Sequence, residues 1–264
     1  MRIWTLPFLL LFLGTAVALA LLVILEGVPV WLSLVVLVAA LVMCLVGGWL
    51  MRSRLMRVGF FLQALLIASG FLYLLPGVAP SVGATFLSYS IVSSITALLG
   101  VAVFICLSYG LAPWRTPRDL WLTILQVVLA LVAAAFLVMR SFLVVLIPSY
   151  PNWVISLGFS LACNFFMFFL LLLRGVCWKR APVAIALLVV NRLIQVVTIS
   201  WSFLLYSFPS TGVLFSLTRV ILVLERVEFP LFYLGLLVLI QTERVRKDQL
   251  PNPVLPPLPV PGSL

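Results

Sequence analysis

The sequence contains no histidine and little charge, since only 8% of its 264 residues are Asp, Glu, Lys or Arg. The lack of histidine excludes His ligands for haem or zinc and imidazole-based acid–base catalysis. The four cysteines include no CxxC pair, which argues against both a metal clip and a disulfide framework. We therefore expect no bound metal and no cofactor.

Charge is scarce because apolar residues make up 65% of the chain. A soluble domain carries about 25% charged and about 45–50% apolar residues, and it needs its polar groups to cover a surface that faces water. The composition therefore excludes an ordinary soluble enzyme, a disordered chain and a fibrous repeat. It indicates a polytopic membrane protein whose main surroundings are the lipid bilayer. The formal net charge of +10 is typical of loops that set membrane orientation, so we expect no nucleic-acid partner.

Apolar runs long enough to cross the hydrocarbon core, about 20 residues each, are the main feature of the sequence. They cover residues 3–25, 29–51, 58–78, 84–109, 120–147, 153–173, 182–207 and 212–241. Proline and glycine mark most of the breaks between them, as expected for turns. The sequence thus predicts an all-α, polytopic transmembrane helix bundle of eight spans that occupies residues 1–249.

The basic residues indicate the orientation of this bundle. If the N-terminus is cytoplasmic and the spans alternate, the inner segments hold 12 of the 16 Lys and Arg residues and the outer loops hold none. Cytoplasmic loops of membrane proteins show this excess. An even number of spans is also supported, because one missed helix would invert every later loop. We therefore predict a multi-pass protein of the cell membrane with both termini in the cytoplasm.

Both ends of the chain have features of their own. Arg2 and the apolar run that follows it also fit a secretory signal peptide, and cleavage would leave seven spans. The run continues through Leu25, which favours an uncleaved helix. Residues 250–264 contain six prolines and predict a disordered cytoplasmic tail. A PxxP spacing within the tail leaves a docking peptide as an alternative to a plain exposed tail.

Charged residues inside the predicted spans are the most informative part of the sequence, because each costs about 2.5–3.5 kcal/mol at the bilayer centre on insertion scales. Four lie near the middle of the last two spans and predict a buried ionic cluster: Arg192, Glu225, Arg226 and Glu228. Consecutive spans joined by a short turn pack as antiparallel neighbours. We therefore predict an ion pair between Arg192 and either Glu225 or Glu228 that marks the functional centre. Pro230 is expected to kink the last span beside this cluster.

Polar side chains also follow one face of the seventh span. Asn191, Gln195, Thr198 and Ser202 are separated by four, three and four residues, and Asn164 lies in the preceding span. Two explanations stay open. These side chains are either hydrogen-bonding contacts that hold the helices together or the lining of a polar pathway or pocket.

Arg140 and Arg219 form a second level of charge. Each lies about 10 Å outward of its helix centre, judged from the helical rise. The sequence places no acidic residue at that depth. Either both side chains extend to the outer lipid phosphates, or they flank a bound small anion or the headgroup of an anionic lipid.

The sequence contains no convincing set of nucleophile, base and oxyanion donor. The first hypothesis is therefore a non-catalytic integral membrane protein: a sensor, an assembly factor or an accessory subunit that contacts another membrane protein or a second copy of itself. The alternative is a transporter or flippase-like protein for an anionic or lipid-like substrate, with proton coupling through the Arg and Glu residues as one option. A membrane-embedded enzyme is the least supported hypothesis, with Glu225 and Glu228 as its acid–base pair.

Overall fold

The computed structural model describes residues 30–72, 85–112, 117–144, 151–207 and 212–249, and every regular element in these ranges is an α-helix. The helices are α2 (Val30–Leu50), α3 (Arg54–Leu72), α4 (Thr85–Leu111), α5 (Pro117–Val144), α6 (Pro151–Leu173), α7 (Gly175–Arg180), α8 (Pro182–Ser207) and α9 (Gly212–Gln249). The all-α prediction is confirmed for these residues. The predicted first span, 3–25, and the proline-rich tail, 250–264, lie outside them.

The helices follow the predicted apolar runs, with shifts of a few residues at several ends and two larger differences. The structure adds α7, a helix of six residues between α6 and α8 that is too short to give a periodic signal. It also continues α9 to Gln249, whereas the sequence predicts an end at 241. The extra turns consist mostly of residues with good helix propensity, and no proline lies between residue 241 and Pro251.

Four helices contain segments that are long and apolar enough to cross a membrane: Ser94–Leu111, Asp119–Met139, Ile155–Leu173 and Pro182–Leu205. Large apolar side chains also face outward, as expected for helices in lipid. On α5, Leu131, Val132 and Phe136 are all more than half exposed. Trp49 and Trp121 are exposed near helix ends, and tryptophan prefers the headgroup region of a bilayer. These features fit a membrane protein, while the total span count and the orientation stay predictions.

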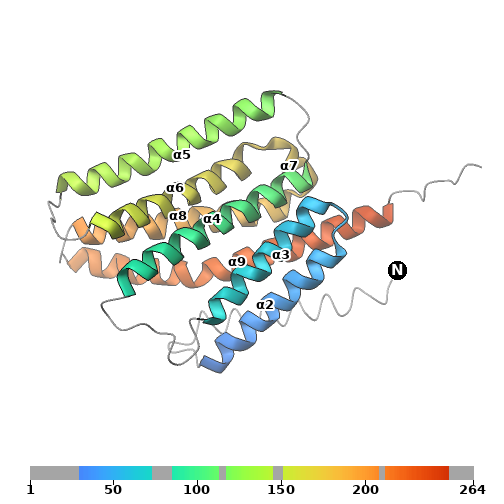
Figure 1. Ribbon diagram of the computed structural model, residues 1–264, viewed down its shortest axis with the longest axis horizontal. Helices are drawn as coiled ribbons and strands as arrows, with labels where there is room; N and C mark the ends of the chain where they lie inside the picture. The colour runs from blue at the N-terminus through green and yellow to red at the C-terminus, as the bar shows by residue number, and fades with distance from the viewer. Residues whose placement is uncertain (1–29, 73–84, 113–116, 145–150, 208–211, 250–264) are drawn as a thin grey trace, which may run out of the picture.

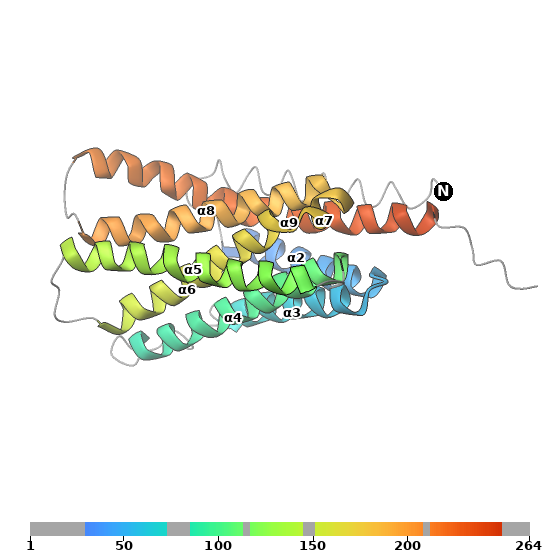
Figure 2. The same ribbon diagram turned by 90° about the horizontal axis from the view of Figure 1, so that it is seen from above.

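Six of the helices form a closed ring. Each packs on the next in the order α2, α3, α4, α6, α8, α9, and α9 closes the ring against α2. Figures 1 and 2 show these helices running along the long axis of the molecule, and α5 lies outside the ring against α6 and α8. The ring encloses a space into which all six helices can direct side chains.

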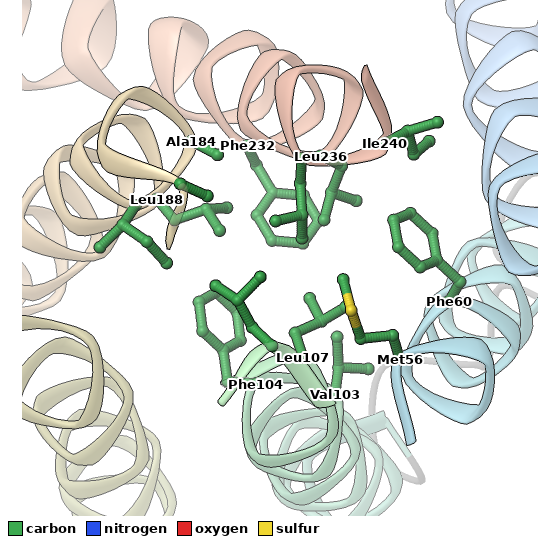
Figure 3. Close-up of a cluster of buried hydrophobic side chains, with 14 of the residues drawn as sticks. Met56, Phe60, Val103, Phe104, Leu107, Ala184, Leu188, Phe232, Leu236 and Ile240 are labelled. Atoms are coloured by element: carbon green, nitrogen blue, oxygen red, sulfur yellow. The ribbon is translucent and has the colours of Figure 1, made fainter. Parts of the chain in front are cut away.

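Apolar side chains fill one end of this ring, and Figure 3 shows several of them in the space between the helices. Met56 and Phe60 of α3 meet Leu107 of α4 and Leu236 of α9 there, and all four are buried. The helices approach closely at this end. A Cβ atom on Gly110 would lie 2.6 Å from the backbone nitrogen of Met56, so only glycine lets α4 pack against the start of α3 in this way.

Two arginines close α4 at the same end of the ring. Arg174 is 6% exposed and donates hydrogen bonds to the Ser108 hydroxyl (2.9 Å) and the Ala112 carbonyl (2.5 Å). Arg180 donates to the Leu111 carbonyl. Carbonyls in the last turn of a helix lack intrahelical donors and carry the negative end of the helix dipole. The two guanidinium groups supply both hydrogen-bond donors and positive charge there. We call this end, which is defined by Arg174 and Arg180, the basic end.

Candidate functional site

A cavity of about 400 Å³ lies inside the ring, next to the apolar core. All six ring helices contribute to its wall. Phe104 and Phe232 belong to both the core and the cavity wall, so the cavity begins where the core of the basic end stops. Apolar side chains of α2 and α3 line one side: Leu37, Leu66 and Ile67. Polar side chains of α6, α8 and α9 line the other: Ser160, Asn164, Arg192, Gln195 and Glu228.

Arg192 is the central residue of the polar side, and only 8% of it is exposed. Its Nε and Nη1 atoms donate to three side-chain amide oxygens, which are Asn191 Oδ1 (2.9 Å), Asn164 Oδ1 (3.1 Å) and Gln195 Oε1. The guanidinium carbon also lies 4.6 Å from the ring centroid of Phe104 and 5.5 Å from that of Phe232. Neutral acceptors and aromatic rings thus hold a cation in a region where an isolated charge is costly.

Gln195 connects Arg192 to Glu228. Its amide oxygen accepts from Arg192 and its amide nitrogen donates to Glu228 Oε1. The sequence predicts a direct ion pair between Arg192 and Glu225 or Glu228. Within the described part of the chain, Arg192 and Glu228 instead meet through this neutral amide. Glu225 is exposed on α9 and does not line the cavity.

Asn191 ties α8 to the backbone of α9. It is fully buried, and its Nδ2 donates to the backbone carbonyl of Glu228 (2.7 Å). Pro230 lies two residues further along α9 and has no backbone N–H to donate. In Figure 2 the two halves of α9 are not collinear. The polar side of the cavity therefore lies where the hydrogen bonding along α9 is interrupted.

The two charged groups each keep one atom available. Among the described residues, neither Arg192 Nη2 nor Glu228 Oε2 has a hydrogen-bond partner. Arg192 is 8% exposed and Glu228 is half-buried, and both side chains line the cavity. A molecule in the cavity can therefore reach one charged donor and one charged acceptor that the described residues leave unused.

The polar stripe of α8 divides into two parts. Asn191 and Gln195 take part in the network around Arg192, together with Asn164 of α6. Further along α8, the Thr198 hydroxyl donates to the Gln195 carbonyl (3.0 Å) and the Ser202 hydroxyl donates to the Thr198 carbonyl (3.2 Å). The hydroxyls of Thr198 and Ser202 are thus hydrogen-bonded within α8. Of the stripe, only Asn191 and Gln195 belong to the network beside the cavity.

Three predicted site residues stay untested. Arg140 lies in α5, and Arg219 and Arg226 lie in α9. Their side chains fall outside the described residues. Contacts of Arg140 and Arg219 with an anion or lipid phosphate therefore stay predictions, as does the place of Arg226 in the ionic cluster.

Sequence analysis missed a second polar contact of the cavity. Gln63 of α3 donates to the hydroxyl of Tyr233 on α9 (3.3 Å), and both residues line the cavity. Gln63 is a single amide inside an apolar run, which was the available signal. Tyr233 packs on Phe229 and Phe232, with ring centroids 4.4 and 5.2 Å apart, and no sequence pattern distinguishes it from these neighbouring aromatics.

The arrangement is suited to binding an ionic ligand. In the described part of the chain, no three His, Cys, Asp or Glu side chains lie together in a way that could hold a metal ion. The cysteines Cys44, Cys106, Cys163 and Cys177 are free thiols and do not line the described cavity. The cavity combines one cation, one carboxylate, several neutral hydrogen-bonding groups and an apolar wall. Ligand sites for amphiphilic molecules have this combination of an apolar lining and a few convergent polar groups.

No protein-family model, no curated protein and no solved structure matches this chain. The function is therefore inferred from the cavity and the side chains that line it.

Proposed function

We propose that this protein is a non-catalytic integral membrane protein that binds a ligand with an anionic group and an apolar body inside the six-helix ring. One observation supports the proposal most directly. Arg192 lines the cavity with Nε and Nη1 fixed by amide oxygens, and its Nη2 has no partner among the described residues. A cation that is already positioned and desolvated binds an anion strongly, because the cost of ordering it does not fall on the binding step.

The opposite wall of the cavity supports the apolar part of the ligand. Leu37, Leu66 and Ile67 provide a surface for hydrocarbon. The cavity volume of about 400 Å³ falls within the usual range for ligand pockets, about 300–1,000 Å³. A single-chain amphiphile could place its charged group at Arg192 and its first methylene groups along this wall.

Binding of dodecyl phosphate to the purified protein tests the proposal. The protein is kept in a neutral maltoside detergent, and its melting temperature is followed as dodecyl phosphate is added, because a ligand that binds only the folded state raises that temperature. We expect the melting temperature of the wild type to rise and that of Arg192→Gln to stay constant. Arg52→Gln is the matched control, since Arg52 is exposed and does not line the cavity.

A second pair of variants tests the position of the ligand without changing any charge. Gly100 lines the cavity, and the nearest atom to a Cβ placed there is Met167 Sδ at 3.8 Å. Gly100→Ala should therefore bind as the wild type does, whereas Gly100→Phe should fill the cavity and prevent binding. Equal binding by the wild type, Arg192→Gln and Gly100→Phe would reject this cavity as the site.

Transport of the same ligand is a second candidate function, and the position of Pro230 favours it. Discontinuous helices beside a binding site are a common feature of transporters, and Pro230 removes one backbone hydrogen bond from α9 at this point. In proteoliposomes, Pro230→Ala should slow ligand uptake and leave binding unchanged. A wild-type protein that binds the ligand but moves none across the bilayer would leave a sensor or accessory role in a membrane complex.

For the chain as a whole, we propose eight spans, both termini in the cytoplasm and a location in the cell membrane. The 12-to-0 distribution of basic residues between inner and outer segments supports this orientation. The lipid bilayer is the principal partner, with Arg140 and Arg219 as candidate contacts for anionic lipid. Another membrane protein or a second copy of the chain is a further partner in the sensor or accessory role.

A further inference from the structure

We infer that the ligand is a zwitterion, which carries a primary amine for Glu228 as well as the anionic group for Arg192. The inference rests on the proposed function and narrows its ligand class. Its basis is the way in which Gln195 holds two opposite charges in the same cavity without letting them pair directly.

The unused atoms of the two charged groups are complementary to such a ligand. Arg192 Nη2 can donate and Glu228 Oε2 can accept, and neither has a partner among the described residues. Gln195 is bonded to both side chains, so neither can turn toward the other without losing a hydrogen bond. With ordinary hydrogen bonds on each side of one amide, the charged groups lie about 5–8 Å apart, beyond the reach of a direct ion pair. A ligand can bridge them from the cavity.

Ligands that carry a single charge fit this arrangement less well. A lone anion beside Arg192 would leave the Glu228 carboxylate unpaired and would be repelled by it. A lone cation beside Glu228 would leave the Arg192 guanidinium unpaired and would be repelled by it. Unpaired charge is costly in the interior of a membrane. A zwitterion pairs both groups and brings no net charge into the protein.

The size of the cavity limits the rest of the ligand. The cavity volume of about 400 Å³ is near the lower end of the usual range for ligand pockets, about 300–1,000 Å³. This is enough for an amine, a short linker, a phosphate or carboxylate and the start of one hydrocarbon chain along Leu66 and Ile67. The same amine-and-anion chemistry is found in the headgroup of an ethanolamine phospholipid and in a small free zwitterion.

Three compounds with matched structures test the inference on the full-length protein in maltoside detergent. Lysophosphatidylethanolamine carries the amine, lysophosphatidic acid with the same acyl chain lacks it, and glycerophosphoethanolamine keeps the phosphodiester and the amine but lacks the chain. We expect the Kd of the wild type for lysophosphatidylethanolamine to be at least about tenfold lower than for lysophosphatidic acid, in the range of one good charge pair. Binding of glycerophosphoethanolamine as tight as that of the lysolipid would identify a small zwitterion as the ligand, and much weaker binding would identify the lipid.

Two carboxylate variants on the same helix assign the amine contact. Glu228→Gln should reduce the difference between the two lysolipids to less than about threefold, because it removes the charge that recognises the amine. Glu225→Gln should keep the full difference, since Glu225 is exposed and does not line the cavity.

The possible outcomes separate this inference from the proposed function. Wild-type binding of lysophosphatidic acid that equals or exceeds that of lysophosphatidylethanolamine would overturn the zwitterion and leave an anionic ligand. A preference for the zwitterion that persists in Glu228→Gln would also overturn it. If neither lysolipid binds in a way that depends on Arg192, the proposed function itself fails. The comparison in the wild type decides the main question even if a variant folds poorly.

Discussion

Replacing Gln195 by leucine removes the neutral link between Arg192 and Glu228 at little cost in volume. Gln195 is half-buried at the cavity wall, so a leucine of similar length can be accommodated. Arg192 loses one acceptor and keeps Asn164 and Asn191. Glu228 loses the one side-chain donor that it has among the described residues. We expect most of the cost to arise at the carboxylate.

The magnitude follows from the two hydrogen bonds that are lost. Bonds to charged groups contribute about 1.5–3 kcal/mol each in soluble proteins. Side-chain bonds between transmembrane helices average about 0.6 kcal/mol and reach about 1.7 kcal/mol. The lower scale applies here, because helices that separate in a membrane find other partners. Gln195→Leu should therefore lower the free energy of unfolding by about 1–3 kcal/mol.

Unfolding by SDS in mixed micelles, followed by circular dichroism, measures this difference. Thr198→Val is the matched control, because the Thr198 hydroxyl bonds a carbonyl of its own helix, and we expect a change below about 0.5 kcal/mol. A double-mutant cycle with Glu228→Gln then measures the link itself. Without Gln195, neutralising Glu228 removes an unpaired carboxylate. The change that Glu228→Gln causes in the free energy of unfolding should therefore be about 1 kcal/mol more positive in the Gln195→Leu background than in the wild type.

The reasoning is refuted by equal effects of Glu228→Gln in the two backgrounds, since Gln195 would then not connect the charges. A Gln195→Leu variant as stable as Thr198→Val would lead to the same conclusion. A cycle between Arg192 and Glu228 gives a further check. The coupling energy between Arg192 and Glu228 should fall when Gln195 is leucine. A direct ion pair between them would keep the same coupling energy.

Three further predictions concern the ring and its orientation. Gly110→Ala should lower the free energy of unfolding by about 1–3 kcal/mol, because its methyl group would meet the backbone of α3. Gly100→Ala should change that free energy by less than about 0.5 kcal/mol, and chemical denaturation compares the two variants. Arg174→Gln should lower the thermal melting temperature because it removes the hydrogen bonds to Ser108 and Ala112 at the end of α4, whereas the exposed Arg52→Gln should not. An impermeant maleimide added to intact cells should label Ser81→Cys, and labelling only after the membrane is opened would reverse the predicted orientation.

Sequence reasoning located the helices but not their order around the ring. Apolar runs bounded by proline and glycine give the position of a span along the chain, which is why α2, α6 and α8 begin within a few residues of the prediction. Neighbours in sequence are expected to be neighbours in space. Here α6 packs against α4 as well as against α5, its neighbour in sequence. Large apolar side chains cover much of the surface of α5, so its sequence pattern does not distinguish a lipid-facing helix from one inside the ring.

The level of the charged residues along their helices could be predicted from the sequence, whereas their individual contacts could not. The helical rise places Arg192 and Glu228 at the same level, and the structure brings both to one cavity. The contact between Gln63 and Tyr233 was missed, because it joins residues 170 positions apart and neither belongs to a polar pattern. Arg174 lies between the predicted spans 153–173 and 182–207, and the sequence indicates no partner for it. Its contacts with the end of α4 depend on the turn through α7, which has no signal in the sequence.

The direction of a side chain around its helix explains why a bridge forms in place of the predicted ion pair. Asn191 and Arg192 point about 100° apart, and Gln195 points about 40° from Asn191, between the two directions. Asn191 faces α9, where it binds the Glu228 carbonyl, so Arg192 is turned toward α6 and the cavity. The sequence defines these angles relative to one another but not which of them faces α9. Once Asn191 takes that place, Gln195 is the residue of α8 that can reach both Arg192 and Glu228.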